Sequence, residues 1–156
     1  LESEPGKGSH FMLTLKDVVL DAPDVDSNTL QDKVDFTQKT VLVAEDEDSN
    51  YQLMKLFLDK MGVSVLRARN GKEAVEIVKS DQEINLVMMD IKMPEMDGYE
   101  ATRIIREIDP GIPVIAQTAY SMEEDVEKAL AVGCSDHISK PINSKSLREI
   151  LKKYLQ

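Results

Sequence analysis

The chain has little of what small domains often use to stabilise themselves or to bind polyanions. It contains one cysteine, no tryptophan, three phenylalanines and four tyrosines, and its formal net charge is −10. The single cysteine, Cys134, excludes an internal disulfide and suits a reducing compartment. The negative charge opposes nucleic-acid binding, and no apolar run approaches the roughly 20 residues of a membrane span. With so few aromatic residues, the core must be aliphatic and rich in methionine.

The chain divides into a short irregular part and a longer regular part. Within residues 17–39, the stretch DVVLDAPDVDSNTLQDKVD is acidic, is broken by Pro23 and shows no sustained periodicity. We interpret residues 17–39 as a linker. From residue 40 to residue 156, apolar runs alternate with helical patterns, which indicates one folded domain.

The regular part predicts strands that alternate with helices. The predicted strands cover residues 40–44, 63–67, 84–89, 112–117 and 134–139. The predicted helices cover residues 49–61, 70–80, 98–108, 121–132 and 143–155. Ser49 and Asn70 are predicted N-caps, and Gly62 and Gly133 stand where helices should end. Such alternation is typical of a parallel sheet covered by helices on both faces, an α/β three-layer sandwich.

Acidic residues follow two of the predicted strands. The first strand leads into Glu45 and Asp46, and the third ends in Asp90. With the strand order 2-1-3-4-5, these strands are neighbours, and their carboxyl ends flank the crevice where open α/β sheets bind ligands. Converging carboxylates repel one another unless a cation lies between them. Because Mg²⁺ prefers oxygen ligands, we predict a Mg²⁺ site here.

Two further strand ends carry groups that suit a phosphoryl ligand. Thr118 ends the fourth strand, and Lys140 follows the fifth. A hydroxyl and an ammonium group that face a metal–carboxylate site are what a tetrahedral dianion needs. An Asp carboxylate can act as the nucleophile and form an aspartyl phosphate. The combination therefore predicts phosphoryl transfer to an acid.

Four segments together resemble the receiver domain of two-component response regulators. They are VLVAEDEDSN, VMMDIKMPEMDGYEATRIIR, IPVIAQTAYSM and GCSDHISKPI, which begin at residues 41, 87, 112 and 133. The sequence is most similar to receivers at the C-terminus of hybrid histidine kinases. The resemblance implies a flavodoxin-like fold and a phosphoryl group taken from a phosphohistidine. Asp90 would be the acceptor, Asp46 would bind Mg²⁺ directly, and Glu45 would bind it mostly through water. Lys92 would supply its backbone carbonyl to the metal.

The resemblance also implies how the domain would respond to phosphorylation. Thr118 would move to the phosphoryl oxygen, Lys140 would pair with it, and the Lys140–Pro141 peptide bond would be cis. His137 stands where most relatives carry a Tyr or Phe ring that rotates inward when the threonine moves. An imidazole is polar and titrates near neutral pH. The changed conformation would signal through protein contact, and no nucleic-acid or membrane contact is expected of this chain.

The first helix of this domain is expected to carry the docking surface for a partner. We predict that one side, with Leu53, Leu56 and Phe57, covers the sheet. The other apolar residues should keep substantial solvent exposure and dock the partner: Tyr51, Met54 and Leu58. In the family, a histidine kinase dimerisation domain or a histidine phosphotransfer domain packs against this helix. A methionine in the patch suits that use, because its side chain adapts to different partners.

Residues 1–16 resemble a second, incomplete domain. The string SEPGKGSHFMLTL is similar to the last glycine box and terminal strand of a histidine-kinase ATPase domain, although a Gly-Ser-His string is also typical of a cloning scar. Such a remnant would confer no ATP-dependent kinase activity. Because an apolar strand seeks another edge, we expect residues 10–16 to pair with a neighbouring chain or to dock on the receiver. A cytoplasmic receiver of a membrane-anchored parent kinase fits this order of segments.

Three alternatives stay open at this point. Asp46 and Asp48 form the Asp-x-Asp of a haloacid-dehalogenase-type phosphatase, as nucleophile and general acid, but that function leaves Asp90 unexplained. A flavin-binding electron carrier shares the fold, but it needs a neutral phosphate-binding loop that EDEDSN does not supply. A receiver that is never phosphorylated and only binds proteins would keep the same fold.

Overall fold

The computed structural model of the chain describes residues 2–3, 9–10, 36–80, 82–119 and 123–156. It separates two units, Leu1–Lys33 and Val34–Gln156. In the first unit, β1 (Glu2–Ser3) pairs antiparallel with β2 (Ser9–His10). The predicted linker up to residue 35 and the predicted strand beyond His10 lie outside the described residues, as does the pairing expected of that strand.

The second unit contains a parallel five-stranded sheet in the order β4-β3-β5-β6-β7. Its strands are β3 (Thr40–Ala44), β4 (Ser64–Ala68), β5 (Leu86–Asp90), β6 (Val114–Thr118) and β7 (Asp136–Ser139). Its helices are α1 (Asp48–Lys60), α2 (Gly71–Lys79), α3 (Gly98–Ile108), α4 (Glu123–Ala131) and α5 (Ser144–Leu155). Counted from β3, the strand order is 2-1-3-4-5, so the predicted flavodoxin-like fold is confirmed.

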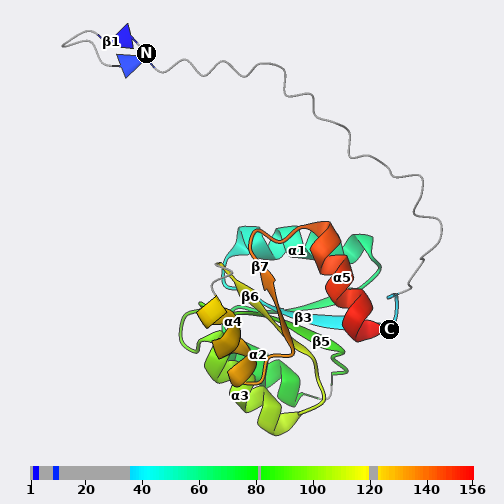
Figure 1. Cartoon of the computed structure of the whole chain (residues 1–156). Helices are drawn as coiled ribbons and strands as arrows, with labels where there is room; N and C mark the ends of the chain where they lie inside the picture. The colour runs from blue at the N-terminus through cyan, green and yellow to red at the C-terminus, as the bar shows by residue number, and fades with distance from the viewer. Residues whose placement is uncertain (1, 4–8, 11–35, 81, 120–122) are drawn as a thin grey trace. The chain divides into compact units, whose positions relative to one another are not determined.

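Two helix layers cover the sheet. Figure 1 shows α1 and α5 on one face and α2, α3 and α4 on the other. The strands alternate between the two sides, so Met88 packs in the cluster with Leu58 and Leu151, whereas Met89 packs in the cluster with Ile105. As predicted, aliphatic and methionine side chains dominate both clusters. No helix of the described residues has the length and apolar character needed to cross a bilayer.

The orientation predicted for α1 is wrong. The three residues expected to remain exposed are only 8%, 3% and 0% exposed, respectively: Tyr51, Met54 and Leu58. Of the three residues predicted to cover the sheet, Leu53 and Leu56 are 45% and 49% exposed, and only Phe57 is half-buried against the core cluster. The buried stripe starts at Tyr51 (position i), includes positions i+3 and i+7, and continues at i+10 to Met61. The stripe that starts at Leu53 meets the charged Lys60 at its own position i+7 and is therefore shorter. A helix buries its more continuous apolar stripe, so the predicted docking set lies in the core.

Most elements begin or end one or two residues from the predicted positions, and only β3 and α3 have the predicted bounds. Phe36, which the sequence analysis places in the linker, is buried in the cluster beneath α1 and α5. Ser49 is not the N-cap of α1; Glu47 occupies that position, and the Ser49 hydroxyl donates to its carboxylate at 2.6 Å. The Asn70 side chain caps α2 as predicted, and the Lys140–Pro141 bond is cis, as the resemblance implies.

Gly98 brings the first turn of α3 against the end of β5. Its backbone N–H donates to the Ile91 carbonyl at 3.0 Å. A Cβ atom at this position would overlap the Asp90 carbonyl oxygen and lie 2.9 Å from the Ile91 Cα. Because both are backbone atoms, neither can move without displacing the end of the strand that carries Asp90.

We expect Gly98→Ala to lower the free energy of unfolding by about 2 kcal/mol, as overpacking of a close backbone contact does. Gly111→Ala is the matched control, because its Cβ would meet only the Asp109 side chain, at 3.3 Å. That change should stay within about 0.5 kcal/mol. Urea denaturation measures both, and equal losses would show that the approach of α3 to β5 is not a tight constraint.

Candidate functional site

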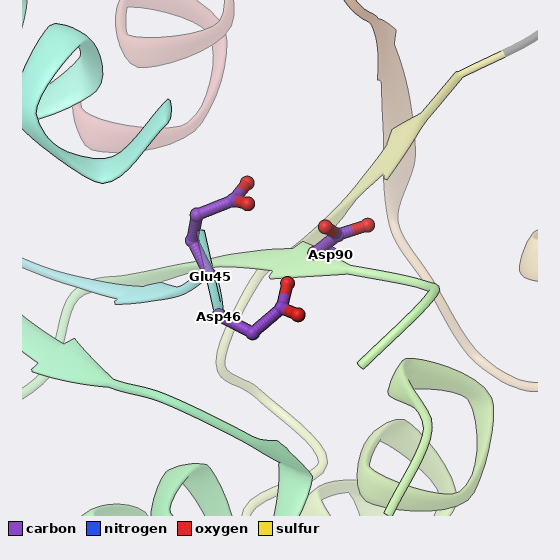
Figure 2. Close-up of side chains that lie close together, drawn as sticks. All are labelled: Glu45, Asp46 and Asp90. Atoms are coloured by element: carbon purple, nitrogen blue, oxygen red, sulfur yellow. The ribbon is translucent and has the colours of Figure 1, made fainter. Parts of the chain in front are cut away.

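Three acids project from the neighbouring carboxyl ends of β3 and β5. Glu45 and Asp46 follow β3, Asp90 ends β5, and each offers an oxygen within 4.8 Å of the others. Figure 2 shows the three side chains at the same edge of the sheet. Glu45 and Asp90 are buried, whereas Asp46 is exposed. The structure therefore brings together the acids that the sequence analysis expected to converge.

Lys140 connects two of these acids. Its Nζ atom lies 2.7 Å from Glu45 Oε2 and 2.6 Å from Asp90 Oδ2. Burial alone would lower the pKa of Lys140, but its hydrogen bonds and charge interactions with Asp90 and Glu45 raise that pKa above the ordinary value. Lys140 is therefore a cation at neutral pH. The second oxygen of Glu45 accepts hydrogen bonds from the Asn50 side chain at 3.1 Å and from the Glu47 backbone at 3.3 Å.

Thr118 offers a hydroxyl beside the acids. It ends β6 and is buried, and its Oγ1 atom has no hydrogen-bond partner within the described ranges. The Lys140 backbone N–H donates to the Thr118 carbonyl at 2.7 Å, which holds the ends of β6 and β7 together. A buried hydroxyl without a partner calls for an explanation, and a ligand in this cavity would supply the missing partner.

The groups surround an open cavity of about 730 Å³ whose donors fit a hard divalent cation. The cluster at the strand ends holds three carboxylates and the Lys140 ammonium group. When these four groups are ionised, the cluster carries two uncompensated negative charges, which one Mg²⁺ would balance. Lys92 lines the same cavity, and its backbone N–H donates to Asp90 Oδ1 at 3.2 Å. The oxygen-only ligands and the solvent-facing side of Asp46 suit an ion that keeps several waters.

His137 lies apart from this cluster. Its ring nitrogen Nδ1 is 3.7 Å from Asp136 Oδ1. The ring borders a different hollow, formed with Ile150 and Lys153 of α5, and it is half-buried. The expected inward rotation of His137 stays a prediction.

Asp48 does not join the acid cluster. It is exposed, and the Arg67 guanidinium lies 2.6 Å from its carboxylate. The Arg67 guanidinium beside Asp48 lowers the pKa of that carboxyl group, whereas a general acid at neutral pH needs a raised pKa. This geometry does not support the phosphatase alternative, in which Asp48 would donate a proton.

Several cavity residues were not identified from the sequence. Asn50 follows the acidic strand end closely enough to have been found. Tyr99 and Lys128 come from α3 and α4, and the Lys128 ammonium lies 4.3 Å from the centroid of the Tyr99 ring. Their proximity depends on how α4 packs on α3, for which the sequence gives no signal. Gln117 also lines the cavity and was overlooked because it occupies a strand interior.

A parallel sheet with an acid cluster, a lysine and an unpaired hydroxyl at its carboxyl edge defines a class of phosphoryl-accepting signalling domains. Residues 41–152 match the family model of the response regulator receiver domain. The chain belongs to this family, and it is a receiver domain of two-component phosphorelay signalling.

The similar proteins include both sequences and solved structures. Over 119 residues, the chain is 41% identical to hybrid signal transduction histidine kinase I of Dictyostelium discoideum; the match covers 71% of this chain and 7% of the kinase. The chain thus spans a small part of that relative. The Ssk1 receiver of Saccharomyces cerevisiae was solved with the histidine phosphotransfer protein Ypd1. It is similar with a TM-score of 0.72 and 31% identity, and the match covers 76% of this chain and 90% of that receiver. The receiver of sensor histidine kinase PA1611 from Pseudomonas aeruginosa was solved with a magnesium ion in its active-site cleft. It is similar with a TM-score of 0.70 and 31% identity, and the match covers 75% of this chain and 97% of that receiver.

Lys140→Met should lower the free energy of unfolding by about 3 kcal/mol in the absence of Mg²⁺, because it leaves two buried carboxylates without their counter-charge. The loss should be smaller in an Asp90→Asn background. Lys72→Met is the matched control, since Lys72 pairs with Glu95 at 3.5 Å on the surface and should cost less than about 1 kcal/mol. Urea denaturation gives both values, and similar losses for the two lysines would contradict this account of the site.

Proposed function

We propose that Asp90 accepts a phosphoryl group from a phosphohistidine and that the chain is the receiver of a hybrid histidine kinase. The observation that carries this proposal is the Asp90 carboxylate, which faces Glu45 and Asp46 with the Lys140 ammonium 2.6 Å away. A phosphorus atom that enters the cavity would meet a nucleophile, a cation and an unpaired hydroxyl together.

Each group has a defined task in the transfer. An Asp90 oxygen attacks phosphorus while the phosphorus–nitrogen bond breaks, and the imidazole leaves with the electron pair. Mg²⁺, when bound, supplies charge neutralisation at the phosphoryl oxygens. Asp46, Asp90 and the backbone carbonyl of Lys92 would hold it directly, and Glu45 mostly through water. Since phosphoryl transfer depends mostly on positioning and electrostatics, the fixed strand ends contribute most of what the protein can supply.

The product would be stabilised by Lys140 and by Thr118, which would move to the phosphoryl oxygen. The Lys140 ammonium would pair with one phosphoryl oxygen, and the Thr118 hydroxyl would donate to another. His137 would then take the switch role of the family's aromatic residue.

We further propose that residues 1–16 are a remnant of the kinase ATPase domain, that residues 17–35 link it to the receiver, and that the terminal strand pairs with a second chain. The proposed parent acts in the cytoplasm.

Asp90→Asn should abolish labelling of the chain by acetyl phosphate and Mg²⁺, because the nucleophile is lost. Asp46→Asn should weaken Mg²⁺ binding and slow labelling. Asp48→Asn is the matched control and should label like the wild-type chain, since Asp48 lies outside the acid cluster. Mass spectrometry of the labelled protein locates the phosphoryl group. Labelling that survives in Asp90→Asn, or a wild-type chain that never labels, would contradict the proposal.

The exposed side of α1 supports a docking surface different from the predicted set, which is buried. Leu53 and Leu56 are exposed there, and Leu53 borders a hollow that it shares with Pro141 and Ile142. This surface lies beside the cavity that contains Asp90, which we call the acceptor cavity. Asn50 of the same helix lines both the acceptor cavity and the hollow at Leu53. The Ssk1 receiver, which resembles this chain, was solved with a histidine phosphotransfer protein. We propose that a phosphohistidine donor domain docks on Leu53 and Leu56.

Leu56→Asp should slow phosphoryl transfer from a phosphorylated histidine phosphotransfer protein by about tenfold, because a charge replaces an apolar contact. Labelling by acetyl phosphate should not change, since the small donor needs no docking. Leu130→Asp is the matched control: Leu130 of α4 is 48% exposed, against 49% for Leu56. Rapid-quench measurement of the transfer rate decides the matter. Equal slowing by both substitutions would remove α1 as the docking surface.

A further inference from the structure

A second, smaller cavity lies between α1 and the turn that follows β7. Its volume is about 60 Å³. The walls are apolar and come from both elements: Leu53, Met54, Phe57, Pro141 and Ile142. Leu53 and Pro141 are exposed, so the rim reaches the surface proposed for donor docking. Glu45 and Lys140 line both this cavity and the acceptor cavity, so the two spaces adjoin.

Gln117 is the polar residue of this cavity that the fold leaves unsatisfied. Glu45, Asn50 and Lys140 also line the cavity, but Asn50 and Lys140 both donate hydrogen bonds to Glu45. Gln117 lies on β6 and is 0% exposed, yet neither its amide oxygen nor its amide nitrogen has a hydrogen-bond partner among the residues described. Its neighbours Ala116 and Val114 belong to the cluster on the α2–α4 side, whereas Ile115 belongs to the cluster beneath α1 and α5. By strand alternation, the Gln117 side chain lies on the α1 side, where the small cavity is.

An unsatisfied buried amide is not explained by packing. An apolar residue of the same size would fill this position without leaving a donor and an acceptor unpaired. Buried polar groups without partners are rare in folded proteins, and they concentrate where a ligand or a water supplies the missing hydrogen bonds. The amide of Gln117 presents one acceptor and two donor hydrogens. A group that offers both a donor and an acceptor would therefore complete it.

The size of the cavity restricts the ligand further. At about 10–15 Å³ for one water-sized group, a space of about 60 Å³ holds about four to six non-hydrogen atoms. This is the end of one side chain, and it excludes a nucleotide or a folded-back peptide. The apolar walls favour a ligand with an apolar stem. The Gln117 amide favours a ligand whose polar end group both donates and accepts hydrogen bonds.

We propose that this cavity binds a primary amide on a short apolar stem, of the kind that an Asn or Gln side chain of the phosphohistidine donor presents while it docks on α1. The partner assignment rests on the proposed function, whereas the amide site itself rests on Gln117 alone. Occupation of the cavity would anchor the donor domain beside Lys140 and Glu45, and it would distinguish donors that carry an amide at this position from donors that do not.

Two small probes of equal shape test this site. Propionamide carries an apolar stem and a primary amide, and butanone replaces the amide nitrogen by a methyl group, which removes the donors. Each is titrated into isotope-labelled protein, and NMR follows the Gln117 side-chain amide and the methyl groups of Met54 and Ile142. Propionamide should bind about fivefold more tightly than butanone, which is the effect of one net hydrogen bond. In Gln117→Leu, butanone should bind at least as tightly as propionamide.

Several outcomes would overturn the proposal. They are equal or tighter binding of butanone to the wild-type chain, binding of neither probe, and a preference for propionamide that survives in Gln117→Leu. The first two would mean that water alone satisfies Gln117. If Gln117→Leu does not fold, Gln117→Met serves in its place. The readout does not involve phosphorylation, so a chain that binds propionamide but is not labelled at Asp90 would refute the proposed function and leave the amide site standing.

Discussion

The site depends on one ammonium group held between two carboxylates from different strands. Lys140 follows β7, Glu45 follows β3 and Asp90 ends β5, so the two short contacts tie together strand ends that are far apart in sequence. Two effects oppose each other at Lys140: burial favours the neutral amine, and the carboxylates favour the cation. The carboxylates prevail, and the raised pKa of Lys140 expresses that balance. Without the Lys140 cation, the two buried acids at this edge would destabilise the fold.

The same edge of the sheet keeps groups that the fold alone does not satisfy. The Thr118 hydroxyl and the Gln117 amide are buried without partners in the described part of the chain, and Asp46 faces solvent beside two buried acids. Folding favours none of these features, because unpaired polar groups and uncompensated charges both cost stability. They are consistent with a site prepared for a divalent cation, a phosphoryl group and a partner, each of which would supply what is missing.

The sequence predicted those features that depend on period and on strand ends. Apolar runs that alternate with helical patterns predicted the five strands. The acids that follow two of these strands predicted the cluster of Glu45, Asp46 and Asp90. The side of α1 that faces the sheet was predicted wrongly, because two apolar stripes run along that helix and only the longer one, which ends at Met61, is buried. Gln117 was overlooked, since a polar residue inside a strand has meaning only once the helix opposite it is known.

The pKa of Lys140 tests the central claim most directly. An NMR titration that observes lysine Nζ nitrogens would compare Lys140 with an exposed lysine such as Lys79, with folding followed in the same spectra. The account predicts that Lys140 titrates above its ordinary value of 10.5 and that Glu45→Gln lowers its pKa. A pKa of Lys140 below 10.5 would contradict the account, because burial would then outweigh the carboxylates on which the site depends.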